Sequence, residues 1–330
     1  MSYLKFLYLA FGAALLFVVV TQIDVGEVLR LTFQIGWGMA IILGLHCLSF
    51  LADVFAWQLT LPGVPLDRRW LWRLWKARMI GETFNTVIPA AGLGGEPLKA
   101  VLLNQHYGID YRESIASLIL SQTIIVIALV IFLAGGFIFM LRAPEVPLSL
   151  DIIAGVGLAG IILAIALIVA LQHFRLISIL GARLKGWRVG QRIEAVLHHV
   201  RDVEERLFVF YAHYRARFAA ALVFSFIPWL IGVPEIYYAA AFIGHPISFV
   251  DAWIIEAAVQ MVRAGLSVVP MGIGAQEGIF LGIVSLLTGS PPLGAALALV
   301  RRGRELVWIL WGAAVGLAFF PLRTFFGRRS

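Results

Sequence analysis

The chain has 330 residues, of which 61% are hydrophobic and only 14% are charged, and its mean hydropathy is +0.92. Soluble proteins average about 45–50% apolar and about 25% charged residues. This composition therefore excludes an ordinary soluble enzyme and a disordered protein, and the single cysteine, Cys47, excludes a scaffold of intrachain disulfides. The net charge of +7 indicates orientation in a membrane and contact with lipid, with no role in binding nucleic acid.

Long and continuous apolar runs predict the fold class, an all-α polytopic membrane bundle. A transmembrane helix needs about 20 apolar residues, whereas the strands of outer-membrane barrels alternate apolar and polar residues over about ten. Eight stretches are predicted to cross the membrane: 3–22, 36–61, 114–141, 152–172, 217–243, 248–269, 271–289 and 293–320. A ninth stretch, 83–103, is interrupted by prolines and glycines and is not counted as a simple crossing. We expect a single transmembrane domain over residues 1–330.

Basic residues gather in segments that alternate with the spans. Segments 66–80 and 174–216 carry a clear excess of Lys and Arg, whereas 21–35 and 142–151 have one basic residue each. The positive-inside rule therefore predicts that both termini and both basic segments are cytoplasmic. The first span lacks a clear small-x-small cleavage site before Asp24, so we interpret it as a retained anchor and not as a signal peptide.

The two basic segments show helical spacing of apolar residues. Leu71, Leu74, Trp75 and Met79 predict a helix that lies in the headgroup layer, or alternatively a basic extension of the second span. Residues 193–207 predict an amphipathic helix that packs on the membrane or on the bundle.

The most informative pattern is an interruption that occurs twice. In Pro89–Glu96 and again in Pro270–Glu277, a proline precedes a glutamate by seven residues with Gly-x-Gly between them. Prolines and glycines break helices, and broken backbone survives in a membrane only where protein or a water-filled cavity satisfies it. Such a pair in corresponding halves of a chain is typical of transporter binding sites. The alternative is two ordinary kinks with small residues for close helix packing.

We therefore expect 83–103 and 270–289 to be broken or re-entrant segments around a polar cavity, related by a possible internal repeat. Glu96, followed by Pro97, and Glu277 suit the first turns of new helices, because a carboxylate is stabilised at the positive end of a helix. The count of spans places both breaks near the cytoplasmic side, whereas an inverted repeat would place them on opposite sides.

Ionisable residues inside apolar stretches are the second indication of a polar cavity. A charge near the bilayer centre costs about 2.5–3.5 kcal/mol on insertion scales. The residues concerned are Asp53, Glu96, Lys99, Glu235, Glu256, Arg263, Glu277, Arg301, Arg302, Arg304 and Glu305. The group of arginines within 293–320 predicts a continuous helix that lines the cavity, and we assign no role to Asp53.

Four sequence elements together resemble a known family. They are Asn85-x-x-x-Pro89, Gly94-Gly95-Glu96-Pro97-x-Lys99, Pro270-x-Gly-x-Gly-x-x-Glu277 and Arg302 in the last span. With the length, the number of spans and the motif order, they make the chain similar to the lysylphosphatidylglycerol synthase transmembrane-domain family, whose members are also called flippase-like proteins. Arg301 stands where the family usually has an aromatic residue, so Arg301 and Arg302 are both candidates for the functional arginine.

The resemblance implies a multi-pass protein of the bacterial inner membrane that moves lipids between leaflets. It is closest to the stand-alone members, one branch of which is associated with hopanoid lipids. The sequence lacks the cytosolic aminoacyl-transferase domain of the two-part members, so we expect no synthesis of aminoacylated lipid.

We predict a lipid flippase or transporter in which a polar-headed or hopanoid lipid passes its headgroup through the cavity. The predicted lipid-binding residues are Asn85, Glu96, Lys99, Arg263, Glu277 and Arg302. The basic side chains and helix N-termini would hold an anionic group, and the glutamates a proton or a cationic headgroup. No nucleophile–base pair or metal-ligand cluster is visible, so we expect no enzyme, metal or cofactor. The alternative is a non-transporting membrane partner that scaffolds a lipid-synthesis enzyme through segment 174–216.

Overall fold

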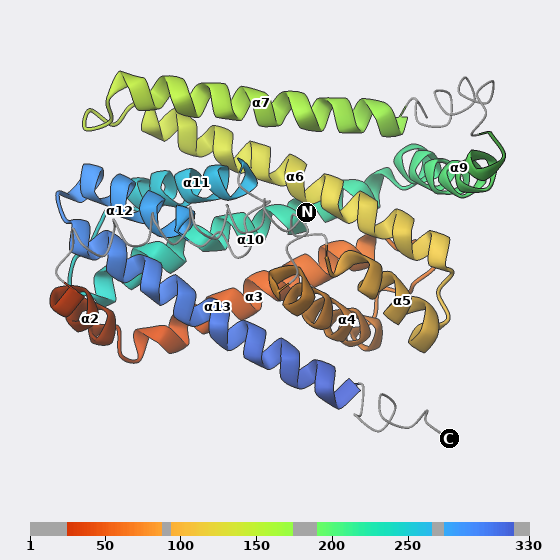
Figure 1. The fold of residues 1–330 in the computed structure, drawn as a ribbon, viewed down its shortest axis with the longest axis horizontal. Coiled ribbons are helices and arrows are strands. Elements are labelled where there is room, and N and C mark those ends of the chain that lie inside the picture. The colour runs from red at the N-terminus through yellow and green to blue at the C-terminus, as the bar shows by residue number, and fades with distance from the viewer. Residues whose placement is uncertain (1–24, 88–93, 174–189, 266–273, 320–330) are drawn as a thin grey trace.

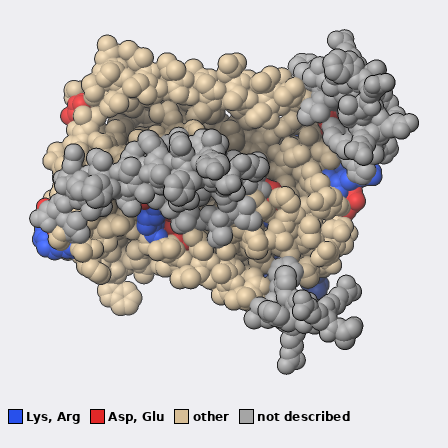
Figure 2. All heavy atoms as spheres, in the orientation of Figure 1, with Lys and Arg blue, Asp and Glu red and all other residues tan. Residues whose placement is uncertain are grey.

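The computed structural model describes residues 25–87, 94–173, 190–265 and 274–319, and the regular structure in these ranges is entirely helical (Figure 1). This confirms the predicted all-α membrane bundle. Over the face seen in Figure 2, most of the described surface is neither acidic nor basic. Such a surface is what a bundle surrounded by lipid requires, because charged side chains are costly in hydrocarbon.

Four helices are long and apolar enough to cross a membrane. They are α3 (Gly38–Leu59), α6 (Tyr111–Met140), α7 (Leu148–His173) and α10 (Arg215–Phe242). They correspond to four of the eight predicted spans, whereas the span predicted at 3–22 lies outside the described residues. On α7, Ile153, Val156 and Leu163 are each more than half exposed, so this helix presents an apolar face outward.

Helices α4 (Arg68–Val87) and α5 (Glu96–Tyr107) fold back on one another as an antiparallel hairpin. At its open end the rings of Trp70 and Tyr107 lie 5.9 Å apart. At its closed end the backbone N–H of Gly95 donates to Asn85 Oδ1 at 2.5 Å. The joining residues 88–93 lie outside the described part of the chain. The start of α4 and the end of α5 lie at the same end of the bundle (Figure 1).

The predicted crossings 248–269 and 271–289 are described only in part, because residues 266–273 lie outside the described ranges. The structure has a 17-residue helix, α11 (Phe249–Gly265), and a 14-residue helix, α12 (Ala275–Thr288). A 14-residue helix is about 21 Å long, which is too short for a hydrocarbon core of about 30 Å. Figure 1 shows α11 and α12 beside one another at the end of the bundle opposite to α5. We call α11 and α12 together the second hairpin. A hydropathy profile of the sequence assigns each of these two helices to a separate short span.

The last helix, α13 (Pro291–Phe319), connects the two hairpins. Near its start it approaches α12 so closely that a methyl group on Gly294 would lie 2.7 Å from the carbonyl oxygen of Phe280. Further along, a methyl group on Gly312 would lie 2.9 Å from the carbonyl oxygen of Met79 on α4. The described helices of the two hairpins therefore pack on opposite halves of α13, whereas the residues of the two predicted breaks, 88–93 and 266–273, lie outside the described ranges. The helix is continuous through its arginines, as predicted.

The two basic segments are helical; the first packs differently from the prediction, and the second packs on the bundle, one of its two predicted positions. Leu74, Trp75 and Met79 of α4 are buried in a core shared with α3, α5 and α13, so this face contacts protein and not the headgroup layer. The predicted amphipathic helix is α9 (Gly190–His213), whose Leu207 and Phe210 pack against α6. A short helix, α2 (Val25–Gln34), lies against α13.

Candidate functional site

A cavity of about 480 Å³ lies between α3, α4, α10, α11 and α13. Its wall carries ten ionisable side chains within an otherwise apolar bundle. They are His46, Asp53, Arg78, Glu82, Glu235, Glu256, Arg263, Arg301, Arg304 and Glu305. Both hairpins contribute, α4 through Arg78 and Glu82 and α11 through Glu256 and Arg263, so the cavity lies where the two hairpins approach one another.

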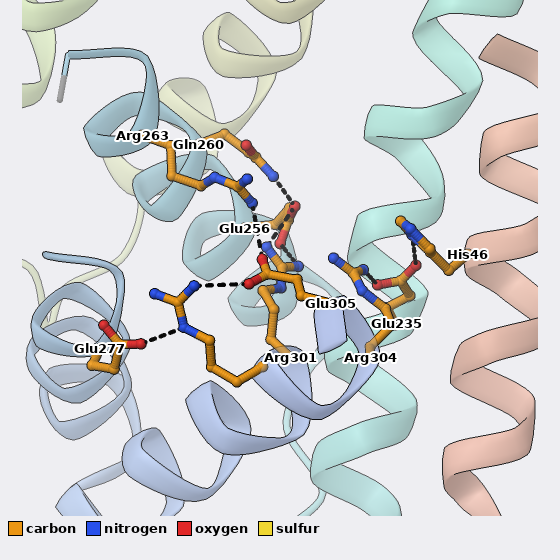
Figure 3. A network of polar contacts seen from close by, with 10 residues as sticks. His46, Glu235, Glu256, Gln260, Arg263, Glu277, Arg301, Arg304 and Glu305 are labelled. Atoms are coloured by element: carbon orange, nitrogen blue, oxygen red, sulfur yellow. Dashed lines mark hydrogen bonds and ion pairs between the residues drawn. The ribbon is translucent and has the colours of Figure 1, made fainter. Parts of the chain in front are cut away.

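The charged stretch of α13 faces carboxylates from two neighbouring helices (Figure 3). Arg301 donates two hydrogen bonds to Glu256 of α11, at 2.5 and 3.3 Å. Arg304, three residues further along the same helix, forms an ion pair with Glu235 of α10. The four side chains are between 2% and 7% exposed. Buried charges are tolerated when they are paired and hydrogen-bonded, and this pairing explains how a continuous apolar helix can carry the arginines.

His46 of α3 extends the second of these pairs. Its Nδ1 lies 3.7 Å from Glu235 Oε1, and its ring stands edge-on to Trp308 at 4.6 Å. His46 thus brings α3 into contact with the Arg304–Glu235 pair.

A second chain of contacts joins three of the predicted residues at the α12 side. Arg302 Nε donates to Glu277 Oε1 at 2.6 Å, and Arg302 Nη1 donates to Glu305 Oε2 at 2.9 Å. Arg263 of α11 reaches Glu305 from the other side at 3.5 Å. Glu277 also accepts a hydrogen bond from the backbone N–H of Gly274 at 2.8 Å and so caps α12. Predicted residues Arg263, Glu277 and Arg302 thus belong to one network through Glu305.

The other three predicted residues meet at the tip of the first hairpin. Lys99 is 1% exposed, and its Nζ lies 2.7 Å from Glu96 and 2.8 Å from Glu82. Asn85 holds the start of α5, because it accepts from Gly95 and donates to Glu96 at 3.2 Å. Gln122 of α6 also donates to Glu96, at 3.2 Å. This network reaches the cavity through Glu82.

The six predicted residues therefore divide into two networks. The sequence prediction grouped Glu96, Glu277 and Arg302 around one site, whereas the structure pairs Glu277 with Arg302 and places Glu96 with Lys99. Of the six, Arg263 lies on the cavity wall, and the other five lie behind it. Arg263 is also the most accessible of the charged wall residues that α11 and α13 supply, with its side chain 43% exposed.

Sequence reasoning missed Arg78, Glu82 and His46. Arg78 forms an ion pair with Asp53, which had been given no role, and both line the cavity. A signal was present in the spacing, because His46 and Asp53 are seven residues apart and lie on one face of a helix. Arg78 had been counted among the basic residues that set orientation. Within the described residues, no group of three or more His, Cys, Asp or Glu is placed to hold a metal ion.

These features define a multi-pass helical membrane protein with a charged cavity between two opposed helical hairpins. The sequence profile of the family described as "Lysylphosphatidylglycerol synthase TM region" matches residues 5–313, and the chain belongs to this family. It is also similar to a "UPF0104 membrane protein" from Methanothermobacter thermautotrophicus, with 23% identity over 293 residues that cover 80% of this chain and 79% of the relative. No solved structure matches the chain.

Proposed function

We propose that this protein moves a lipid with a polar headgroup between the two leaflets. The headgroup passes through the charged cavity while the acyl chains stay in the bilayer. The observation that carries the proposal is the cavity itself: ten ionisable side chains surround about 480 Å³ inside a bundle whose outer face is apolar. Ionisable residues within a membrane bundle are costly, and they mark pathways for polar substrates.

The two hairpins support this proposal because each supplies charged side chains to the cavity wall, Arg78 and Glu82 from α4 and Glu256 and Arg263 from α11. Half-helices whose ends meet near the bilayer centre are a recurring construction of transporters, which alternate access around a fixed site. The family to which the chain belongs is described by a transmembrane region, which favours transport over catalysis.

The proposal includes a location. The basic helices α4 and α9 lie at the same end of the bundle as the C-terminal end of α13 (Figure 1). The positive-inside rule places this end in the cytoplasm, and we place the protein in a bacterial inner membrane. Replacing two crossings by one hairpin leaves the predicted sides of all other loops unchanged, and we propose that both termini are cytoplasmic.

The test is leaflet exchange in vesicles that contain only the purified protein. Fluorescent lipid is distributed over both leaflets, and an impermeant reductant bleaches the outer leaflet. Protein-free vesicles lose about half of the signal, so faster and deeper bleaching measures exchange. The assay is repeated with several lipid headgroups, with and without a proton gradient. If the protein-containing vesicles bleach no more than protein-free vesicles in every case, transport is rejected. The remaining function is then that of a membrane partner of a lipid-synthesis enzyme.

A further inference from the structure

The short helix α2 carries apolar side chains on two different faces. Leu31 and Ile35 are buried in the core that includes residues of α13. Leu29 and Phe33 are instead 46% and 79% exposed. Because they are four residues apart, they lie on one side of the helix. One apolar face of α2 therefore packs on the bundle, and the other is open within the described part of the chain.

The turn that follows α2 presents a third exposed apolar side chain, Trp37. It is 91% exposed, yet its backbone is well held. Gly36 has a φ of +44°, which glycine adopts at no steric cost, and the N–H of Gly38 donates to the Ile35 carbonyl oxygen at 2.7 Å. Gly38 lies so close to Phe242 of α10 that an added methyl group would clash with the ring. An ordered turn thus directs the tryptophan outward.

The polar residues of α2 occupy a third side of the helix. Arg30 and Gln34 are exposed and four residues apart, and Arg30 forms an exposed ion pair with Glu27 at 3.9 Å. An exposed apolar face with leucine and aromatic residues beside a charged face is typical of a helix that lies in the membrane interface.

The direction of α2 agrees with such a position. Figure 1 shows α2 largely end-on, whereas α7 and α13 run across the picture. The helix therefore lies across the direction of the long helices, close to the plane of the membrane. It is found at the end of the bundle away from the basic helices α4 and α9.

The exposed apolar surface continues from Trp37 along α3. Ile41 and Leu48 follow Trp37 by four and eleven residues, which places them on the same side of the helix, and they are 47% and 55% exposed. Because α3 is long and apolar enough to cross the membrane, this side contacts hydrocarbon. Trp37 lies at its end, and tryptophan is enriched at that level, where membrane and water meet.

We propose that α2 is an interfacial helix whose Leu29, Phe33 and Trp37 insert into the boundary between lipid headgroups and acyl chains. The continuity with the hydrocarbon-facing side of α3 favours lipid over a protein partner. With the cytoplasm at the α4 and α9 end, the contact is with the outer leaflet. Since α2 packs on α13, it connects the membrane surface to the helix that carries the arginines of the cavity.

Spin-label accessibility tests the proposal on the full-length protein in vesicles of phosphatidylethanolamine and phosphatidylglycerol. In a Cys47→Ser background, Phe33→Cys is labelled with a nitroxide, and its collisions with oxygen and with a water-soluble nickel complex are measured. Oxygen concentrates in the bilayer, so the ratio of the two gives the depth. We expect the label about 5–10 Å inside the boundary.

Two further positions calibrate the measurement. Arg30→Cys, on the polar side of the same helix, should collide freely with the nickel complex. Leu48→Cys on α3 should lie deeper than Phe33→Cys, because it follows Trp37 by three helical turns. Trp37→Cys provides a second test should Phe33→Cys fail to yield folded protein in size-exclusion chromatography, since the tryptophan is almost fully exposed.

Two results would overturn the proposal. If Phe33→Cys collides with the nickel complex as often as Arg30→Cys, the exposed face of α2 lies in water. If the label is immobilised and reached by neither reagent, protein covers this face, either the residues before 25 or a second copy of the chain. The measurement does not involve lipid exchange, so loss of the transport proposal would leave this inference intact, and the reverse holds as well.

Discussion

Arg302 Nε donates a hydrogen bond to Glu277 Oε1 at 2.6 Å, and this contact joins the first turn of α12 to the middle of α13. Both side chains are about 15% exposed, and Glu277 also holds the backbone N–H of Gly274. The pair therefore stabilises the turn into α12 and has a structural role as well as a place in the polar network.

We expect Glu277→Gln and Arg302→Gln each to destabilise the protein by about 3 kcal/mol, because each leaves a largely buried charge without its partner. The double variant should recover part of this loss, with a coupling energy of about 1–3 kcal/mol. Thermal unfolding in one detergent measures all three. Glu27→Gln is the control, because its ion pair with Arg30 is long and exposed, and it should change stability by less than about 0.5 kcal/mol. Additive single effects would show that the pair is not coupled.

For Arg263 we predict a loss of transport and not of stability. Its side chain lines the cavity, and its ion pair with Glu305 is long, at 3.5 Å. Arg263→Gln should leave thermal stability nearly unchanged and slow lipid exchange about ten-fold, through the loss of a charge-assisted contact to the headgroup. The matched control is Arg206→Gln on α9, which is 42% exposed, pairs with Asp110 at 3.0 Å and lies outside the cavity. Equal rates for both variants and the wild type would remove Arg263 from the path.

The local features of the fold could be predicted from the sequence. The Gly-Glu-Pro motif correctly places the start of α5 at Glu96, and Glu277 occupies the first turn of α12, because helix N-termini depend on residues near in sequence. The arginine-rich stretch of α13 is helical as predicted, since no helix breaker other than Gly303 occurs in it.

What could not be predicted depends on residues far apart in the chain. A hydropathy window treats 271–289 as one short span, and the close packing of α12 on α13 could not be predicted from it. In the same way, Asp53 gains its role from Arg78, which is 25 residues away on another helix. The six predicted residues divide into two networks because Asn85, Glu96 and Lys99 lie on the first hairpin, whereas Arg263 and Glu277 lie on the second and Arg302 lies on α13.

Cysteine accessibility can test the second hairpin. In a background with Cys47→Ser, Ala264→Cys near the end of α11 should react with a small thiol reagent that enters the cavity, whose wall includes Ala264. It should resist a bulky impermeant maleimide added from either side of sealed vesicles. Arg206→Cys and Glu145→Cys serve as references for the two ends of the bundle. If α11 crossed the membrane, Ala264→Cys would label with the maleimide as fast as Arg206→Cys.

The packing of α12 on α13 leads to the last prediction, which concerns Gly294. A methyl group there would lie 2.7 Å from the Phe280 carbonyl oxygen and 2.9 Å from Leu281 Cα, and backbone atoms cannot move aside as a side chain can. Gly294→Ala should therefore separate the helices and destabilise the protein by about 1–3 kcal/mol. Gly160→Ala on α7 is the control: no atom lies within 4 Å of its added methyl group, and the higher helix propensity of alanine should leave stability equal or slightly increased. The measurement is the midpoint of thermal unfolding of both variants. Equal midpoints would show that α12 and α13 can separate without loss of stability, and that this contact does not hold the second hairpin in place.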